Sequence, residues 1–168
     1  MFNDIFNEND MLKLQELLRA HNKTITTAES CTGGLVSYMI TQISGSSDIF
    51  NGAIVSYSNE IKHKELNVKE ETLENFGAVS HETVNEMLKG TLEKFRADYA
   101  IAISGIAGPS GGTEKKPVGT VVIGVGGKNI DFMVSTHHFL GNRNEVQIQA
   151  AKTSLKEILN FFQKTLDK

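Results

Sequence analysis

The chain of 168 residues has the size of one compact domain, and its 39% content of hydrophobic residues is enough for a buried core. A net charge of -3 and an acidic start, MFNDIFNEND, argue against a nucleic-acid-binding protein and against a signal peptide. No apolar run reaches the ~20 residues that span a bilayer, and one cysteine excludes an internal disulfide. We therefore expect a single cytoplasmic domain, residues 1–168, with no nucleic-acid or membrane partner.

Helical and strand patterns alternate in the first half of the chain, as apolar spacing changes between a period of about 3.6 and a period of 2. Asp10 and Ser80 are placed to cap helices. In chain order, the predicted elements are a helix over 10–21, a strand over 24–28, a helix over 31–43, a strand over 52–57, helical segments over 59–65 and 69–76, and a helix over 80–95.

The second half begins with the strongly apolar run YAIAIS, which predicts a third strand over 99–104. A long glycine-rich loop follows. Residues 118–125 and 130–139 are expected to form an antiparallel pair joined at a Gly-Gly pair, and 145–166 to form a long amphipathic helix. Alternating elements favour an α/β layered fold, and the adjacent last strands favour a mixed, mostly central sheet.

The stretch TTAESCTGG joins a predicted strand directly to a predicted helix. Open α/β sheets bind ligands at such strand ends, and the first amides of a helix have no partner within it. The junction therefore suits an anion site, a nucleophile beside an oxyanion hole, or an ordinary helix cap. Ser30 and Cys31 are the candidate nucleophiles, and the candidate binding residues are Cys31, Thr32, Gly33 and Gly34.

A serine nucleophile needs a base, and the histidine spacing does not supply one. His137 and His138 are neighbours on a predicted strand, so their side chains point to opposite faces. A lysine can act as a base where burial or nearby positive charge lowers its pKa. The segment VSYSNEIKHKEL offers Tyr57 at a strand end and then Lys62 as candidates. The same sequence is also consistent with a half-buried tyrosine and a solvated lysine that have no catalytic role.

Two further segments lie beside predicted element ends. The loop GIAGPSGGTEKKP follows the third strand, and a loop of this length suits a binding role or disorder. The candidate binding residues in this loop and at the end of the third strand are Ser104, Gly105 and Gly108. Arg143, in GNRNE, has a planar guanidinium that suits a phosphate, although a lone arginine is also common on surfaces. No cluster has metal-ligand spacing, so we expect no metal and no cofactor.

Together, the segments TTAESCTGG, GSSDIFNGAIVSYSNEIK, GAVS, SGIAGPSGGTEKKPVGTV and GNR resemble the C-terminal domain of the CinA competence/damage-inducible proteins. The resemblance runs from about Leu14 to Leu166, and the chain looks like a stand-alone member without the molybdopterin-binding-like domain of full-length CinA. It implies a three-layer α/β/α sandwich. It also implies nicotinamide-nucleotide amidohydrolase activity, which converts nicotinamide mononucleotide to nicotinate mononucleotide and ammonia in pyridine-nucleotide salvage.

The resemblance also implies catalytic roles. Ser30 matches the proposed nucleophile of the family, Lys62 the proposed base, and Tyr57 a third member of the constellation. We expect amides near Thr32 and Gly33 to form the oxyanion hole, and the phosphate to lie near Arg143 or the 105–112 loop.

Two other functions stay open at this point. One is a weak or inactive nucleotide-binding module that regulates competence or the response to DNA damage. The other is an amidohydrolase that uses Cys31. Whichever function holds, a homo-oligomer is one possible assembly, with a dimer favoured.

Overall fold

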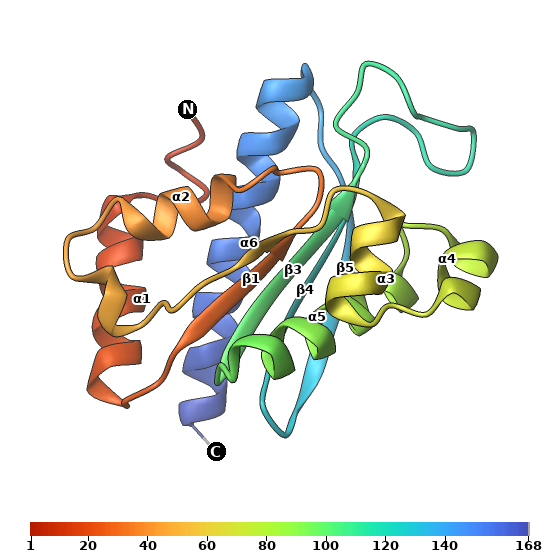
Figure 1. Cartoon of the computed structure of the whole chain (residues 1–168). Coiled ribbons are helices and arrows are strands. Elements are labelled where there is room, and N and C mark those ends of the chain that lie inside the picture. The colour runs from red at the N-terminus through yellow and green to blue at the C-terminus, as the bar shows by residue number, and fades with distance from the viewer. Residues whose placement is uncertain (168) are drawn as a thin grey trace.

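The computed structural model, which describes residues 1–167, is built around one five-stranded sheet in the order β2-β1-β3-β4-β5 (Figure 1). β1 pairs in parallel with β2 and with β3, while β3 pairs antiparallel with β4 and β4 antiparallel with β5. The predicted mixed sheet and the antiparallel last pair are therefore confirmed. The strands are β1 (Ile25–Glu29), β2 (Ile54–Val55), β3 (Tyr99–Gly105), β4 (Thr120–Gly127) and β5 (Ile130–His138).

Strand direction brings the carboxyl ends of four strands to one edge of this sheet. β1, β2 and β3 are parallel, and β5 runs in the same direction because two antiparallel steps separate it from β3. The segments that follow these strands, and that carried the sequence motifs, therefore meet at a single edge. This edge is where ligands of α/β sheets usually bind.

Helices cover both faces of the sheet. β3 shows why both are needed: its Ile101 and Ile103 lie in one hydrophobic core and its Ala100 and Ala102 in the other. The first core is closed by α1 (Glu8–Ala20), α2 (Leu35–Thr41) and α6 (Arg143–Leu166). The second is closed by α3 (Asn59–Leu66), α4 (Glu70–Phe76) and α5 (His81–Phe95). The three-layer α/β/α sandwich is thus confirmed.

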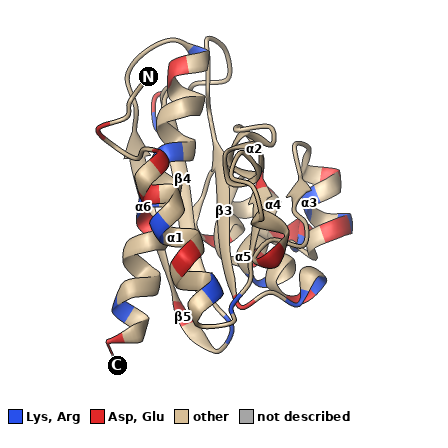
Figure 2. Cartoon of the chain, turned by 90° about the vertical axis from the view of Figure 1, so that its left-hand side faces the viewer, with Lys and Arg blue, Asp and Glu red and all other residues tan. Residues whose placement is uncertain are grey.

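Charged residues of both signs occur on the two helices α1 and α6. Figure 2 shows Lys and Arg interspersed with Asp and Glu along α1 and α6, while the strands carry few charges. Within residues 1–167, no helix combines the length and the apolar character needed to cross a bilayer.

Several predicted boundaries were wrong, because local hydrogen bonds override apolar spacing. Asn7, not Asp10, caps α1: the Asn7 side chain accepts from the Asp10 amide at 3.1 Å, and the Asp10 carboxylate accepts from the Asn7 amide at 2.9 Å. A similar pair of reciprocal hydrogen bonds, a capping box with Asn142 as the N-cap residue, starts α6 at Arg143. The predicted strand over 52–57 is regular only at Ile54–Val55.

The predicted Gly-Gly turn also has to be corrected. Gly126 and Gly127 lie inside β4, and the chain reverses at the next two residues, Lys128 and Asn129. Asn129 has φ 61°, a left-handed conformation that asparagine tolerates better than most residues. The pairing of the two strands was predicted correctly, but its turn was placed two residues too early.

Gly90 sets the distance between α5 and α3, the helix that carries Lys62. A Cβ atom at Gly90 would lie 2.0 Å from the Leu66 carbonyl oxygen, so the two helix backbones pack in direct contact.

We predict that Gly90→Ala destabilises the protein by about 1–3 kcal/mol, the usual range for an overpacked core. Helix propensity alone would have the opposite effect and would stabilise the protein by about 1 kcal/mol, because alanine is a better helix former than glycine. Urea unfolding measures the change, with Lys89→Ala at the exposed neighbouring position as the control. A more stable Gly90→Ala variant would show that the contact with α3 is not tight.

Candidate active site

Ser30 lies immediately after β1, in a turn that fixes its backbone. Its amide donates to the Ile103 carbonyl of β3 at 3.0 Å, and its side chain is almost buried, with 7% exposure. The Ser30 Oγ lies 3.0 Å from the Lys62 Nζ of α3. The structure therefore brings together the two residues that the sequence offered as nucleophile and base.

Lys62 is buried among oxygen atoms. Only 1% of the residue is exposed, and its Nζ donates to the carbonyls of Ser56 at 2.9 Å and Tyr57 at 3.3 Å. Burial lowers the pKa of Lys62 from 10.5 to about 8. A neutral amine has two N–H donors and one lone pair. When the two carbonyls accept both donors, the lone pair is left for the Ser30 hydroxyl.

Local structure explains how Lys62 reaches this position. The Ser56 amide donates to the Glu29 carbonyl at 2.7 Å, so the end of β2 stays beside the end of β1. Ser58 then caps α3, its Oγ accepting from the Ile61 amide at 3.2 Å. Lys62 is the fourth residue of this helix, and its backbone follows directly from the cap.

Glu29, which the sequence reasoning missed, organises the turn around Ser30. Its carboxylate is fully buried, with 0% exposure. One oxygen accepts from the Thr32 hydroxyl at 2.7 Å and from the Gly34 and Val36 amides at 3.2 and 3.0 Å. The other accepts from the Ser37 amide at 3.0 Å and the Ser37 hydroxyl at 2.7 Å. The N-terminus of α2 is thus bound by a carboxylate of the protein itself.

This arrangement corrects the predicted helix over 31–43. The helix begins at Leu35, after a turn in which Gly33 and Gly34 have φ 60° and 102°. Such values favour glycine, so the two glycines serve the turn. The Gly33 amide donates to the Ser30 carbonyl at 3.0 Å, and the Gly34 amide to Glu29. Within residues 1–167, the Cys31 and Thr32 amides donate to no oxygen atom.

Tyr57 contributes through two different groups. Its backbone carbonyl accepts from Lys62, whereas its side chain, 59% exposed, turns toward Arg143. The Arg143 guanidinium donates to the Tyr57 hydroxyl at 2.9 Å and to the Gly108 carbonyl at 2.7 Å. Arg143 therefore joins the segment after β2 to the glycine-rich loop after β3.

Cys31 is next to Ser30 and lines the same cavity, but its thiol is a poor candidate nucleophile. The residue is buried, with 5% exposure, and burial raises the pKa of its thiol to about 12. The Gln147 side chain of α6 donates to the Cys31 carbonyl at 2.9 Å, which ties this turn to α6. A thiol that stays protonated is a poor nucleophile.

A cavity of about 280 Å³ opens on the Ser30–Lys62 pair. Three residues proposed as binding groups, Thr32, Gly33 and Gly34, do not line it, because their turn faces Glu29. The other predicted site residues do line it: Ser30, Cys31, Tyr57, Lys62, Ser104, Gly105, Gly108 and Arg143. The lining residues that sequence reasoning missed include Asn59, Ala78 and Val79.

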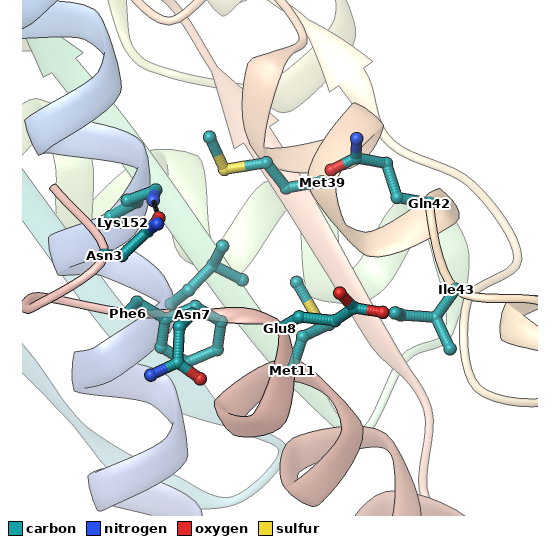
Figure 3. A pocket seen from close by; sticks show the side chains of 10 residues that line it. Asn3, Phe6, Asn7, Glu8, Met11, Met39, Gln42, Ile43 and Lys152 are labelled. Carbon is teal, nitrogen blue, oxygen red and sulfur yellow. Dashed lines mark hydrogen bonds between the residues drawn. The ribbon is translucent and has the colours of Figure 1, made fainter. Parts of the chain in front are cut away.

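A different cavity, of about 330 Å³, lies between the N-terminal segment and helices α1, α2 and α6 (Figure 3). Met11 and Met39 form its apolar walls, and Lys152 is held by the Met1 carbonyl and the Asn3 side chain, both at 2.7 Å. Its lining holds no serine or cysteine beside a base, so we assign the chemistry to the cavity at Ser30. Within residues 1–167, no three His, Cys, Asp or Glu side chains gather to hold a metal.

We predict that Glu29→Gln lowers the free energy of unfolding by about 3 kcal/mol, because the new amide group faces donors where the carboxylate accepted them. Ser37→Ala, which removes one donor, should cost only about 1 kcal/mol. Denaturant unfolding of the two variants and the wild type measures both values. Equal, small losses would mean that Glu29 does not organise the turn.

Comparisons with known proteins show which family the chain resembles. The family model for the CinA C-terminal domain matches residues 8–162. A nicotinamide-nucleotide amidohydrolase PncC from Enterobacter agglomerans is 48% identical over 145 residues, which cover 86% of this chain and 88% of that protein. A CinA-like protein from Prochlorococcus marinus is 49% identical over 154 residues, 90% of this chain. The chain spans only 36% of the length of that relative.

Solved structures share the whole architecture. A CinA superfamily protein from Klebsiella pneumoniae has a TM-score of 0.89 and 32% identity, covering 93% of this chain and 97% of that one. A competence- or damage-inducible protein from Enterobacter asburiae has a TM-score of 0.86 and 37% identity, covering 91% and 96%. Because both the sequence and the fold match over nearly the whole length, this chain belongs to the CinA C-terminal domain family.

Proposed function

We propose that the chain is a nicotinamide-nucleotide amidohydrolase that converts nicotinamide mononucleotide to nicotinate mononucleotide and ammonia. The observation that carries the proposal is the 3.0 Å contact between the Ser30 hydroxyl and the buried Lys62 amine, a nucleophile beside a base. The name of the Enterobacter agglomerans relative supports the choice of substrate. A cytoplasmic location and a homodimer stay predictions.

In the proposed mechanism, the lone pair of Lys62 takes the Ser30 proton while Ser30 Oγ attacks the carboxamide carbon. The carboxamide oxygen becomes an oxyanion. The Cys31 amide is the candidate donor for it, because Cys31 lines the cavity and its amide donates to no other oxygen in residues 1–167. Thr32, expected from the sequence to contribute an amide, does not line the cavity. The Gly33 amide, an earlier candidate, is already bonded to Ser30.

The C–N bond then breaks, and the departing nitrogen takes the proton from Lys62 to leave as ammonia. Tyr57 is placed to assist, because its hydroxyl accepts from Arg143 and so can donate its own proton into the cavity. Water then hydrolyses the Ser30 ester, again with Lys62 as the base. This step releases nicotinate mononucleotide and restores both side chains.

The alternative functions have less support. A module that only bound a nucleotide would gain nothing from an amine buried beside a serine, since an exposed lysine binds an anion without the cost of burial. A Cys31 nucleophile is disfavoured because burial raises the pKa of the thiol to about 12.

We predict that Ser30→Ala abolishes ammonia release from nicotinamide mononucleotide while the fold stays intact. Cys31→Ala is the matched control at the neighbouring position and should keep most of the activity. Initial rates and circular dichroism of both variants provide the test. Activity that survives in Ser30→Ala and disappears in Cys31→Ala would assign the nucleophile to the cysteine.

We predict that Lys62→Arg is nearly as damaging as Lys62→Ala, because arginine keeps the charge but cannot give up its proton at working pH. Loss of a general base commonly costs about a hundredfold to ten-thousandfold in rate. Side-by-side rates of the two variants measure this. If Lys62→Arg keeps most of the activity, the lysine only positions groups or binds an anion.

The pH dependence of the wild-type enzyme gives a further prediction. Because burial lowers the pKa of Lys62 to about 8, the neutral fraction rises as the pH rises through that value. The kcat/KM should therefore increase from pH 6 to pH 9, with an acidic limb near pH 8. A rate that is flat across this window would contradict a lysine base.

A further inference from the structure

We infer that two copies of this chain pair through the outer edges of their β5 strands and so join their sheets into one continuous sheet. β5 is the last strand in the sheet order, and β4 is its neighbour on one side only. The other edge strand, β2, is regular only at Ile54–Val55, and so short an edge recruits no partner strand. β5 is therefore the long open edge of the molecule. The inference does not depend on the proposed function.

Alternate residues of β5 direct their backbone groups away from the sheet. The Phe139 amide donates to the Gly119 carbonyl at 2.8 Å, so the backbone of Phe139 points toward β4. In an antiparallel ladder this direction alternates from one residue to the next. The residues whose N–H and C=O groups point outward are therefore Val134, Thr136 and His138. Within residues 1–167, no strand pairs with these groups.

This edge has little of the protection that monomeric proteins give to such strands. Lysine, proline and β-bulges usually blunt an open edge. Residues 132–140, FMVSTHHFL, contain no proline and no Asp, Glu, Lys or Arg. Asp131 and the one irregularity of pairing with β4 both lie before Met133. Met133 is 53% exposed, and Leu140, just after the strand, is 86% exposed. An open, apolar edge of this kind is expected to be covered.

The regular part of the edge fits a second copy related by a two-fold axis. The regular ladder with β4 runs from Met133 to Phe139, and its middle residue, Thr136, is one of the outward-pointing residues. An axis at Thr136 sets this residue opposite the partner's Thr136, where the two exchange both backbone hydrogen bonds. Val134 and the partner's His138 then exchange bonds in the same way.

The side chains brought together by this register are compatible. Met133 lies opposite the partner's Phe139, a favourable contact between a sulfur atom and an aromatic ring. Thr136 meets the partner's Thr136, and threonine pairs stabilise neighbouring strands. No two carboxylates and no two lysine or arginine side chains face each other, since the segment has none. The pairing therefore covers the apolar edge without opposing like charges.

The first test measures the mass of the protein in solution. Light scattering after size exclusion, over a range of protein concentrations, should give the wild type twice the chain mass of 18.4 kDa. Met133→Lys places a charge on the edge and should shift the protein to the single-chain mass. Leu12→Lys, which changes a 38% exposed leucine on α1, is the matched control and should stay dimeric. Circular dichroism checks that both variants are folded.

The second test measures the register by disulfide crosslinking. In the inferred dimer, the Cα atoms of the two Thr136 residues are about 5.5 Å apart, within the range of about 4.4–6.8 Å that a disulfide spans. Thr136→Cys should therefore crosslink under mild oxidation. His138→Cys, also at an exposed position, is the control. It should not crosslink, because each His138 lies four positions from the partner's His138, roughly 13 Å along the strand. Cys31 is buried and should not react.

The outcomes separate this interface from every other. A wild-type protein with the single-chain mass at all concentrations would overturn the inference. A dimer that resists Met133→Lys would place the interface on another surface. Crosslinking of His138→Cys at least as efficient as that of Thr136→Cys would contradict the two-fold axis at Thr136.

Discussion

The burial of Lys62 against Ser30 is the interaction on which the rest of the site depends. Within residues 1–167, no carboxylate pairs with this amine, and its three partners are two carbonyls and one hydroxyl. An unpaired buried charge is costly, so burial favours the neutral amine. The neutral form has one lone pair, and the two carbonyls leave it to the serine. The burial that makes a charged Lys62 costly is therefore the same feature that makes its neutral amine available as a base.

The sheet and one carboxylate hold this pair in place. Parallel strands put the ends of β1 and β2 side by side, which sets Ser30 opposite the start of α3. Glu29 then binds the first amides of α2 and fixes the turn that follows the serine. A helix N-terminus of this kind often binds a ligand anion. Here it binds the Glu29 side chain, so these amides are not free to bind a ligand anion.

Much of this could be predicted from the sequence. The strand before Ser30 was recognisable from a run of β-branched residues, and the strand that ends at Gly105 from an apolar run. The approximate place of Lys62 was recognisable from a polar helix after a strand. Glu29 could not be recognised, because an acid beside a turn usually lies in solvent, and only the packing of α2 shows that it is buried. The contact between Tyr57 and Arg143 joins residues 86 positions apart, which no local pattern encodes. The start of α2 was misplaced because glycine turns and helical spacing look alike over four residues.

The protonation of Lys62 in the free enzyme can be measured directly by heteronuclear NMR. The side-chain resonance of Lys62, assigned by its loss in Lys62→Met, is followed as the pH is raised from 6 to 11. A base buried against Ser30 should titrate with a pKa near 8. A pKa at or above the ordinary lysine value of about 10.4 would mean that the amine stays charged at working pH, and Lys62 could then not be the base that activates Ser30.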